Sequence, residues 1–167
     1  MFEFTGKPGA NRELEAIGFE GIYTLGRVAG IDTALYGEYE IGLDGPDKIE
    51  TKLLLQKQVG SFDARLNLIA EKRLTGGQPV SFGYAASADA EVLGEIRLGA
   101  AAFGEFGSTR NFLPRTEHYI GPIAKAEIEH LGPGEIEIEA GYLFALSEAK
   151  DKSNGQWRLL VEYEFKF

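Results

Sequence analysis

The side chains able to do acid–base or metal chemistry are few, and the two histidines, His118 and His130, come first. They belong to one segment of alternating pattern. At ~3.3 Å per residue, a strand would hold them roughly 40 Å apart, so they cannot share a metal ion. His130 has Glu127 and Glu129 nearby, which would make a cation site if the acids converged. The simpler interpretation is a solvated strand end, and we predict no metal site.

A second place for chemistry is His118 beside Glu117, at the end of the polar segment Ser108–Glu117. A hydrolase site near His118 is therefore one alternative. The chain has no Gly-x-Ser-x-Gly nucleophile motif. The glycine-rich segments Gly76–Gly77 and Gly104–Gly107 precede no helix, so they do not form a phosphate cradle. We expect His118 to be a loop or interface histidine, and we predict no catalytic residue, no enzymatic activity and no cofactor.

Composition limits the classes of protein further. The 167 residues predict one domain, 1–167, and the absence of cysteine excludes disulfides and thiolate metal sites. Seventeen Lys and Arg against 26 Asp and Glu leave a net charge of −9, which argues against a nucleic-acid partner. Although 44% of the residues are hydrophobic, no apolar run approaches the ~20 residues of a transmembrane helix. Met1 leads directly into Phe-Glu-Phe-Thr without a signal peptide, so we expect either a cytosolic protein or a mature exported form.

Strict alternation of apolar and polar residues is the dominant pattern. It is clearest in Ile31–Leu43, Phe62–Leu74, Glu135–Leu146 and Gln156–Phe167. Because successive side chains of a strand point to opposite faces, each segment has one apolar and one charged face. The pattern predicts an all-β chain of about ten strands, most of them long, at 2–5, 13–25, 31–43, 48–59, 62–74, 80–91, 95–107, 118–131, 135–146 and 156–167.

The loops favour an antiparallel up-and-down transmembrane barrel. The two longest connections, Ser108–Glu117 and Ser147–Gly155, fall at the same end of a meander, and Gly132–Gly134 falls at the other. Long loops at one end and tight turns at the other are typical of outer-membrane barrels. The first segment, Phe2–Thr5, is short. Either the barrel begins with a short strand, or residues upstream are missing and the ten strands belong to a 12-stranded barrel.

Alternation alone does not tell which face meets water. A soluble lipocalin-like barrel that binds an apolar ligand has its apolar face inside, whereas a transmembrane barrel has it outside. Three observations favour the membrane: the strand lengths, aromatic residues near strand ends, and charges on the apolar face only near strand ends, as at Glu15 and Lys57. The charged face would then line the lumen, with the residues Glu38, Glu50, Lys52, Arg65, Arg73, Arg97, Glu105, Lys125, Glu127, Glu137, Glu139, Arg158 and Glu162.

These charges permit two interpretations. Excess acid would make a pore prefer cations. Alternatively, acids and bases pair across a lumen little wider than that of an eight-stranded barrel, which side chains fill. We favour the filled lumen.

The C-terminal segment ends on Phe167, with apolar residues at every second position back to Trp157. It resembles the signal by which bacterial outer-membrane barrels are recognised for assembly. The resemblance implies that Trp157, Tyr163, Phe165 and Phe167 form an assembly signal and that the barrel-assembly machinery is a partner.

Four further segments resemble parts of uncharacterised proteobacterial outer-membrane proteins, a likeness that extends from about Gly18 to Phe167. They are Ala34–Glu40, Asp47–Lys57, Ala102–Gly107 and His118–Pro122. The resemblance implies a barrel in the bacterial outer membrane, in contact with its lipid, and implies no catalytic residues. Those proteins carry further strands before the segment matching Phe2–Thr5. They also carry arginines on the strand matching Tyr84–Glu91, where this chain has Ala85, Ser87, Asp89 and Glu91.

We therefore expect an outer-membrane β-barrel of structural or narrow-pore type, allowing passive diffusion at most. The soluble lipocalin-like barrel and the outer-membrane hydrolase are the alternatives. The sequence does not predict an oligomeric state.

Overall fold

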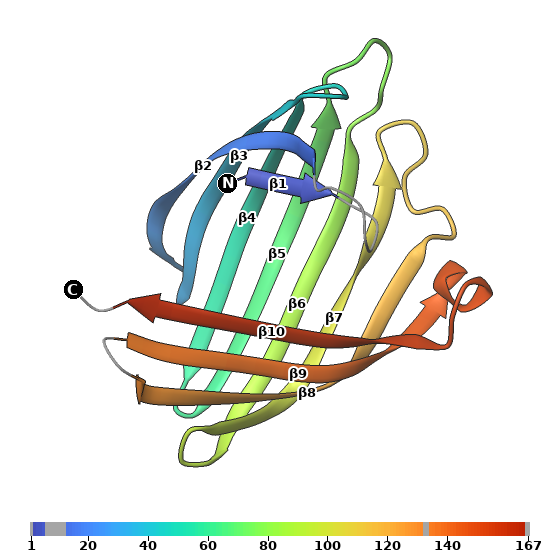
Figure 1. The fold of residues 1–167 in the computed structure, drawn as a ribbon. Helices are drawn as coiled ribbons and strands as arrows, with labels where there is room; N and C mark the ends of the chain where they lie inside the picture. Colours follow the sequence, from blue (N-terminus) through green and yellow to red (C-terminus); the bar gives the residue numbers. More distant parts are fainter. Residues whose placement is uncertain (1, 6–12, 132–133, 166–167) are drawn as a thin grey trace. The chain divides into compact units, whose positions relative to one another are not determined.

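The computed structural model describes residues 2–5, 13–131 and 134–165, and it contains one antiparallel sheet. Ten strands follow one another across this sheet in the order of the sequence (Figure 1). The prediction of an all-β, antiparallel, up-and-down arrangement is confirmed. The strands are β1 (Phe2–Thr5), β2 (Glu13–Val28), β3 (Ile31–Gly42), β4 (Lys48–Val59), β5 (Phe62–Arg73), β6 (Ser81–Leu93), β7 (Ile96–Ser108), β8 (Glu117–Leu131), β9 (Gly134–Ser147) and β10 (Gly155–Phe165).

The β2–β3 hairpin differs from the prediction, because β2 continues to Val28 where the sequence predicted a loop from Gly26 to Gly30. Gly26 has a φ of +82° and lies at a β-bulge, where the register passes from Thr24–Ala34 to Gly26–Thr33. Glycine suits such a bulge because it has no Cβ to clash at positive φ. The turn itself contains only Ala29 and Gly30, both at positive φ, as a tight hairpin turn requires.

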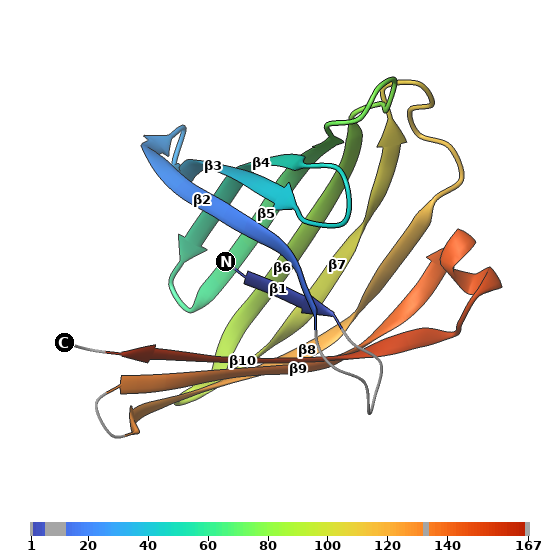
Figure 2. The same cartoon turned by 45° about the horizontal axis from the view of Figure 1, so that its top comes forward.

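The described chain forms two compact units, and each is considered by itself. Unit one comprises Met1–Leu55, Asn67–Tyr84 and Phe106–Pro114. Unit two comprises Gln56–Leu66, Ala85–Glu105 and Arg115–Phe167. Strands β8, β9 and β10 of unit two lie side by side in two views of the structure (Figures 1 and 2). The β9–β10 pairing keeps one register throughout, whereas the β8–β9 register shifts between Ile128 and Leu131.

The two faces of the strands differ in burial in an unusual way. In β3, Glu38 and Glu40 are buried, whereas Tyr39 and Ile41 between and beyond them are exposed. We call the side of the sheet that carries Glu38 the charged face, and the opposite side the apolar face. The charged face holds buried Asp63, Asp89, Lys125 and Glu139 in unit two. The large exposed residues of the strands lie mainly on the apolar face, for example Phe19, Leu35, Leu98, Phe144, Trp157 and Leu159.

The charged face of unit two also carries a small apolar core. Ala101, Ile123 and Leu143 form a buried cluster, with Phe103 and Tyr119 packed against it. Leu143 is fully buried, at 0% exposure. The rings of Phe103 and Tyr119 stack with their centroids 5.0 Å apart. This part of the charged face is therefore filled by side chains and not by charges alone.

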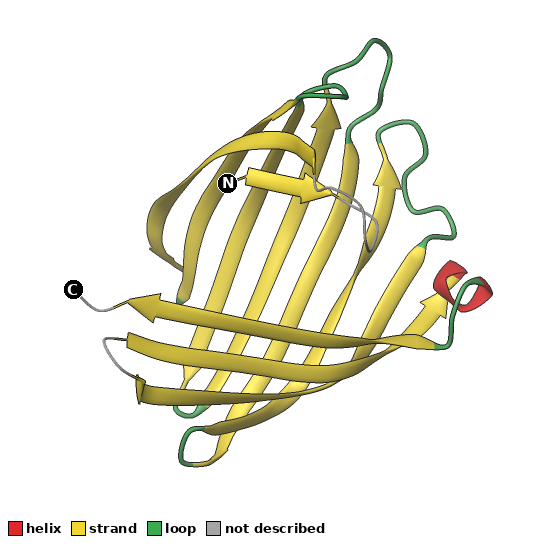
Figure 3. Ribbon diagram, in the orientation of Figure 1, coloured by secondary structure: helices red, strands yellow, loops and turns green. Residues whose placement is uncertain are grey.

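The connection between β9 and β10 contains a short helix. A 3₁₀ helix, η1 (Glu148–Asp151), lies between β9 and β10 and is the helix coloured in Figure 3. The sequence predicted an irregular loop there.

Gly121 in β8 packs so closely against β9 that a Cβ would overlap the carbonyl oxygen of Tyr142. Within the described ranges, no helix has the length and apolar character needed to cross a membrane.

Candidate functional site

Three buried charged residues, Asp89, Lys125 and Glu139, belong to a network on the charged face of unit two. Asp89, 3% exposed, accepts from Arg97 Nε at 2.5 Å and lies 2.9 Å from Lys125 Nζ. Lys125 Nζ also lies 3.8 Å from an oxygen of Glu139, whose other oxygen accepts from Arg158 Nε at 2.6 Å. The five residues come from β6, β7, β8, β9 and β10, so neighbouring strands are joined by alternating charge. Each buried carboxylate has two cationic neighbours.

A second group of polar residues adjoins this network. Buried Asp63 accepts from Gln56 Nε2 at 3.0 Å and from Arg65 Nε at 2.8 Å. Gln56, Asp63 and Arg65 line a cavity of about 180 Å³ together with Arg97 and Lys125. Glu127 and Glu137 line the same cavity. With Glu95, four acids and three bases line this cavity, so the two signs of charge are nearly balanced.

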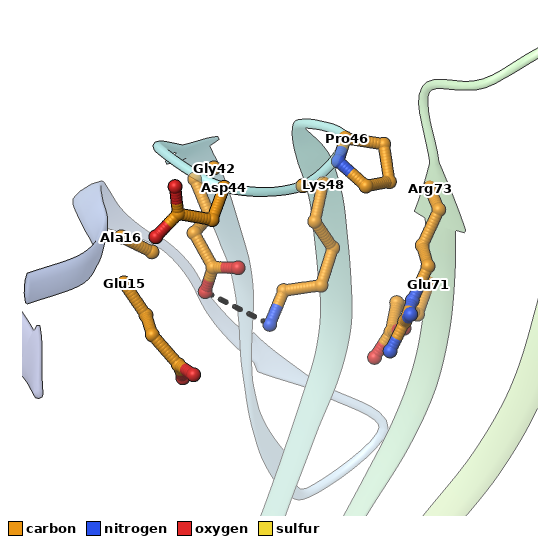
Figure 4. A pocket seen from close by; sticks show the side chains of 10 residues that line it. Glu15, Ala16, Gly42, Asp44, Pro46, Lys48, Glu71 and Arg73 are labelled. Carbon is orange, nitrogen blue, oxygen red and sulfur yellow. Dashed lines mark ion pairs between the residues drawn. The ribbon is translucent and has the colours of Figure 1, made fainter. Parts of the chain in front are cut away.

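A cavity with a volume of about 400 Å³ lies in unit one (Figure 4). The side chains of Glu15, Asp44, Lys48, Glu71 and Arg73 line it, and Glu40 lies 3.0 Å from Lys48 Nζ. Figure 4 shows the lining side chains arriving from several strands and from the loop at Asp44 and Pro46. Four acids against two bases make the cavity acidic. Its one deeply buried acid, Glu40, is neutralised by Lys48.

A third charged group in unit one surrounds Tyr36. The Tyr36 hydroxyl lies 2.7 Å from Glu20 Oε2 and 2.9 Å from Glu38 Oε2, and these two acids are paired across β2 and β3. Lys52 Nζ lies 4.4 Å from the centre of the Tyr36 ring and forms an ion pair of 2.8 Å with Glu50. A phenol has one hydrogen to donate. The oxygens of Glu20 and Glu38 therefore share the single hydroxyl hydrogen of Tyr36.

His118, the histidine considered for hydrolysis, lies within hydrogen-bond distance of a buried threonine, Thr116. Buried Thr116 donates its hydroxyl hydrogen to the carbonyl oxygen of Glu105 at 2.7 Å. His118 Nε2 lies 3.1 Å from the same hydroxyl. Because the single hydrogen of Thr116 is already used, His118 must donate to this oxygen. A general base would have to accept from it, so this pair has the wrong polarity to activate a nucleophile.

The lumen-facing prediction placed thirteen residues on one face, and the structure locates them in several groups. Arg97, Lys125, Glu139 and Arg158 share the buried network, and Glu50 is paired with Lys52. Arg65 is paired with Asp63, Arg73 lines the cavity of unit one, and Glu38 is buried beside Tyr36. Glu127, Glu137 and Glu162 line a further cavity in unit two, and the side chain of Glu105 is exposed.

Several members of these groups lie outside the predicted set, among them Asp89, Asp63, Glu40 and Lys48. Asp89 and Asp63 lie at the centres of their polar groups although the prediction did not include them among the lumen charges. Their position on the charged face of alternating strands was the available signal. The apolar cluster at Ile123 and Leu143 was also missed, since both residues interrupt the alternation of their strands.

The predicted assembly residues lie at the end of the sheet. Trp157 is 83% exposed and contacts Tyr142, with ring centroids 5.1 Å apart. Tyr142 also meets Phe144 edge to face at 5.1 Å. Tyr163 and Phe165 belong to β10, and Phe167 lies outside the described residues.

The loop after β9 carries an ion pair between Lys152 and Glu117. The hydrogen bond to this carboxylate raises the pKa of the Lys152 amine above its ordinary value. This contact joins the loop to the first residue of β8.

No group of three or more His, Asp or Glu residues able to hold a metal ion occurs in the part of the chain that the structure describes. Comparison of the chain with protein-family models, with curated proteins and with solved structures gave no match.

Proposed function

We propose that the chain forms a transmembrane β-barrel of the bacterial outer membrane, with a structural or narrow-pore role. The observation that supports this most directly is the reversed burial of the strands. Large apolar residues such as Trp157, Leu159 and Tyr23 are 83%, 72% and 71% exposed, while Asp89 and Lys125 are 3% and 7% exposed. Transmembrane barrels have this arrangement, with apolar side chains toward lipid and polar side chains toward the lumen.

The soluble lipocalin-like barrel fits less well. Such a barrel buries its apolar face around a ligand and exposes its charged face to water. Here β3 buries Glu38 and Glu40 and exposes Leu35 and Ile41. Exposed apolar residues on many neighbouring strands mark a surface that contacts something other than water. Lipid fits best, because β2 to β10 each have eleven or more residues, enough to cross the hydrocarbon layer.

Between the structural and the narrow-pore role, the filled charged face favours the first. Leu143 is fully buried, and Lys125 forms ion pairs with Asp89 and Glu139. Charges that are neutralised by one another attract permeating ions less than free ones. The hydrolase alternative is not supported by the Thr116–His118 pair, because the Thr116 hydroxyl hydrogen goes to the carbonyl oxygen of Glu105 and is not available to His118.

The single tryptophan gives a direct test of the membrane proposal. Trp157 lies on the apolar face, and Gln156 next to it lies on the other face of the same strand. After refolding into phosphatidylcholine vesicles, Trp157 fluorescence should be blue-shifted and quenched by lipids brominated on the acyl chains. A Trp157→Phe, Gln156→Trp variant should be quenched much less. Equal quenching of the two, or a protein that stays monodisperse without detergent, would contradict the proposal.

Conduction is tested separately by planar-bilayer recording. The structural role predicts no sustained current steps at neutral pH. Steady cation-selective steps would instead support the narrow-pore role.

A further inference from the structure

Four aromatic rings gather at one end of β6 and β7 in unit one. Tyr84 of β6 stacks on Phe106 of β7, with ring centroids 4.9 Å apart. Phe112, which lies beyond the end of β7, meets Phe82 edge to face at 6.0 Å and Phe106 at 6.5 Å. Along β6, the even-numbered residues include Phe82, Tyr84 and the exposed Val92. Along β7, they include Phe106 and the exposed Leu98. The cluster therefore belongs to the apolar face.

The segment that carries Phe112 is an ordered turn and not a loose loop. The backbone of Phe112 bridges to Gly107, and Ser108 N donates to Asn111 O at 2.8 Å. Leu113 N donates to Phe106 O at 2.7 Å. Leu113 has a φ of +55°, a conformation that is strained for a residue other than glycine. These contacts hold the segment folded back over the apolar face.

Two apolar side chains remain exposed in spite of this order. Phe112 is 62% exposed and Leu113 is 66% exposed. A turn this short and constrained has no means of burying them against its own atoms. Among residues 108–114 the only charge is that of Arg110, whose guanidinium donates to Gly77 O at 2.5 Å. An ordered aromatic and aliphatic pair beside a cation, without any acid, is the composition of segments that lie at a membrane interface.

We propose that the tip formed by Phe112 and Leu113 inserts at the boundary between lipid headgroups and acyl chains. There it would set the depth of β6 and β7 in the bilayer. This inference rests on the proposed membrane location and adds a specific contact to it. Lipid is the occupant because the tip continues the apolar face through Phe82 and Phe106, and the same surface is assigned to lipid along the strands.

The experiment places a tryptophan at the tip in a Trp157→Phe background. Phe112→Trp keeps an aromatic ring in the cluster, and Asn111→Trp is the matched control one residue away. Both proteins are refolded into phosphatidylcholine vesicles that carry bromine close to the headgroup end of the acyl chain. We expect the Phe112→Trp protein to lose at least half of its emission and the Asn111→Trp protein to lose far less. Far-ultraviolet circular dichroism checks the fold, and Leu113→Trp replaces the first variant if it does not refold.

The outcomes separate the two proposals. Quenching of native Trp157 together with equal, weak quenching at positions 112 and 111 would overturn the tip insertion and leave the membrane barrel standing. Absence of quenching at Trp157 as well would overturn both.

Discussion

Removing the charge of Asp89 tests whether the buried network stabilises the sheet. In the Asp89→Asn variant, the Arg97 guanidinium can still donate to the carbonyl oxygen of Ser61, which lies 2.9 Å away. Lys125, which is 7% exposed, keeps only Glu139 at 3.8 Å. Loss of one partner from a buried ion pair costs about 3–5 kcal/mol. We expect the lower end, about 3 kcal/mol, because the new amide oxygen still accepts one hydrogen bond.

The assay is urea unfolding of the protein in lipid vesicles, followed by Trp157 fluorescence. With a slope of about 2 kcal/mol per molar, a loss of about 3 kcal/mol lowers the midpoint by about 1.5 M. Asp32→Asn is the matched control, because Asp32 pairs with Arg27 at 2.9 Å but the side chains are 46% and 69% exposed. The control midpoint should not move measurably.

A double variant sharpens this test. Replacing Asp89 by Leu together with Lys125 by Met removes both charges and leaves apolar volume. It should be more stable than Asp89→Asn, because no buried charge is left unpaired. If Asp89→Asn and Asp32→Asn lose equal stability, the network does not contribute as its burial implies, and the reasoning fails.

Three other predictions concern single positions. Gly121→Ala should lose about 1–3 kcal/mol of stability by overpacking. Gly37→Ala should lose far less, because no atom lies within 4 Å of the added Cβ. The urea unfolding midpoints of the two variants measure this difference. Glu38→Gln should lower the midpoint only slightly, because the amide oxygen can still accept the Tyr36 hydroxyl hydrogen, and a loss as large as that of Asp89→Asn would contradict this. The raised pKa of Lys152 means that its ion pair persists below the amine's ordinary pKa and is lost as the pH rises through the folded value. Acylation at pH 9 should therefore modify Lys152 more slowly than exposed Lys150, as peptide mass spectrometry would measure.

The strand positions were largely predictable from the sequence. Alternation over more than ten residues leaves little freedom in where a strand lies, and β4 was predicted at 48–59 as observed. Glycines were harder to interpret. The sequence predicts Gly26 in a turn, but it lies in a bulge within β2. Both conformations need a positive φ, so the glycine alone does not distinguish them. The four residues of η1 are too few to show a helical period.

The buried contacts required information that a single strand does not contain. Asp89, Lys125 and Glu139 lie on different strands, and only the registers between strands decide which charge meets which. Alternation placed all three positions on one face but did not tell how deeply each is buried. Ile123 and Leu143 were missed for the same reason, because a core forms only when several strands bring their exceptions together.

The consecutive order of the ten strands bears on how such a sheet is built and altered. Among the residues that the structure describes, neighbouring strands of the sheet are also neighbours in the sequence. Every pairing therefore closes a chain segment no longer than one connection, which keeps the entropy loss of each step small. The hairpins can be added to the growing sheet one after another from either end. A whole hairpin can also be deleted or duplicated without breaking the pairings that remain, so the strand number changes most easily in steps of two.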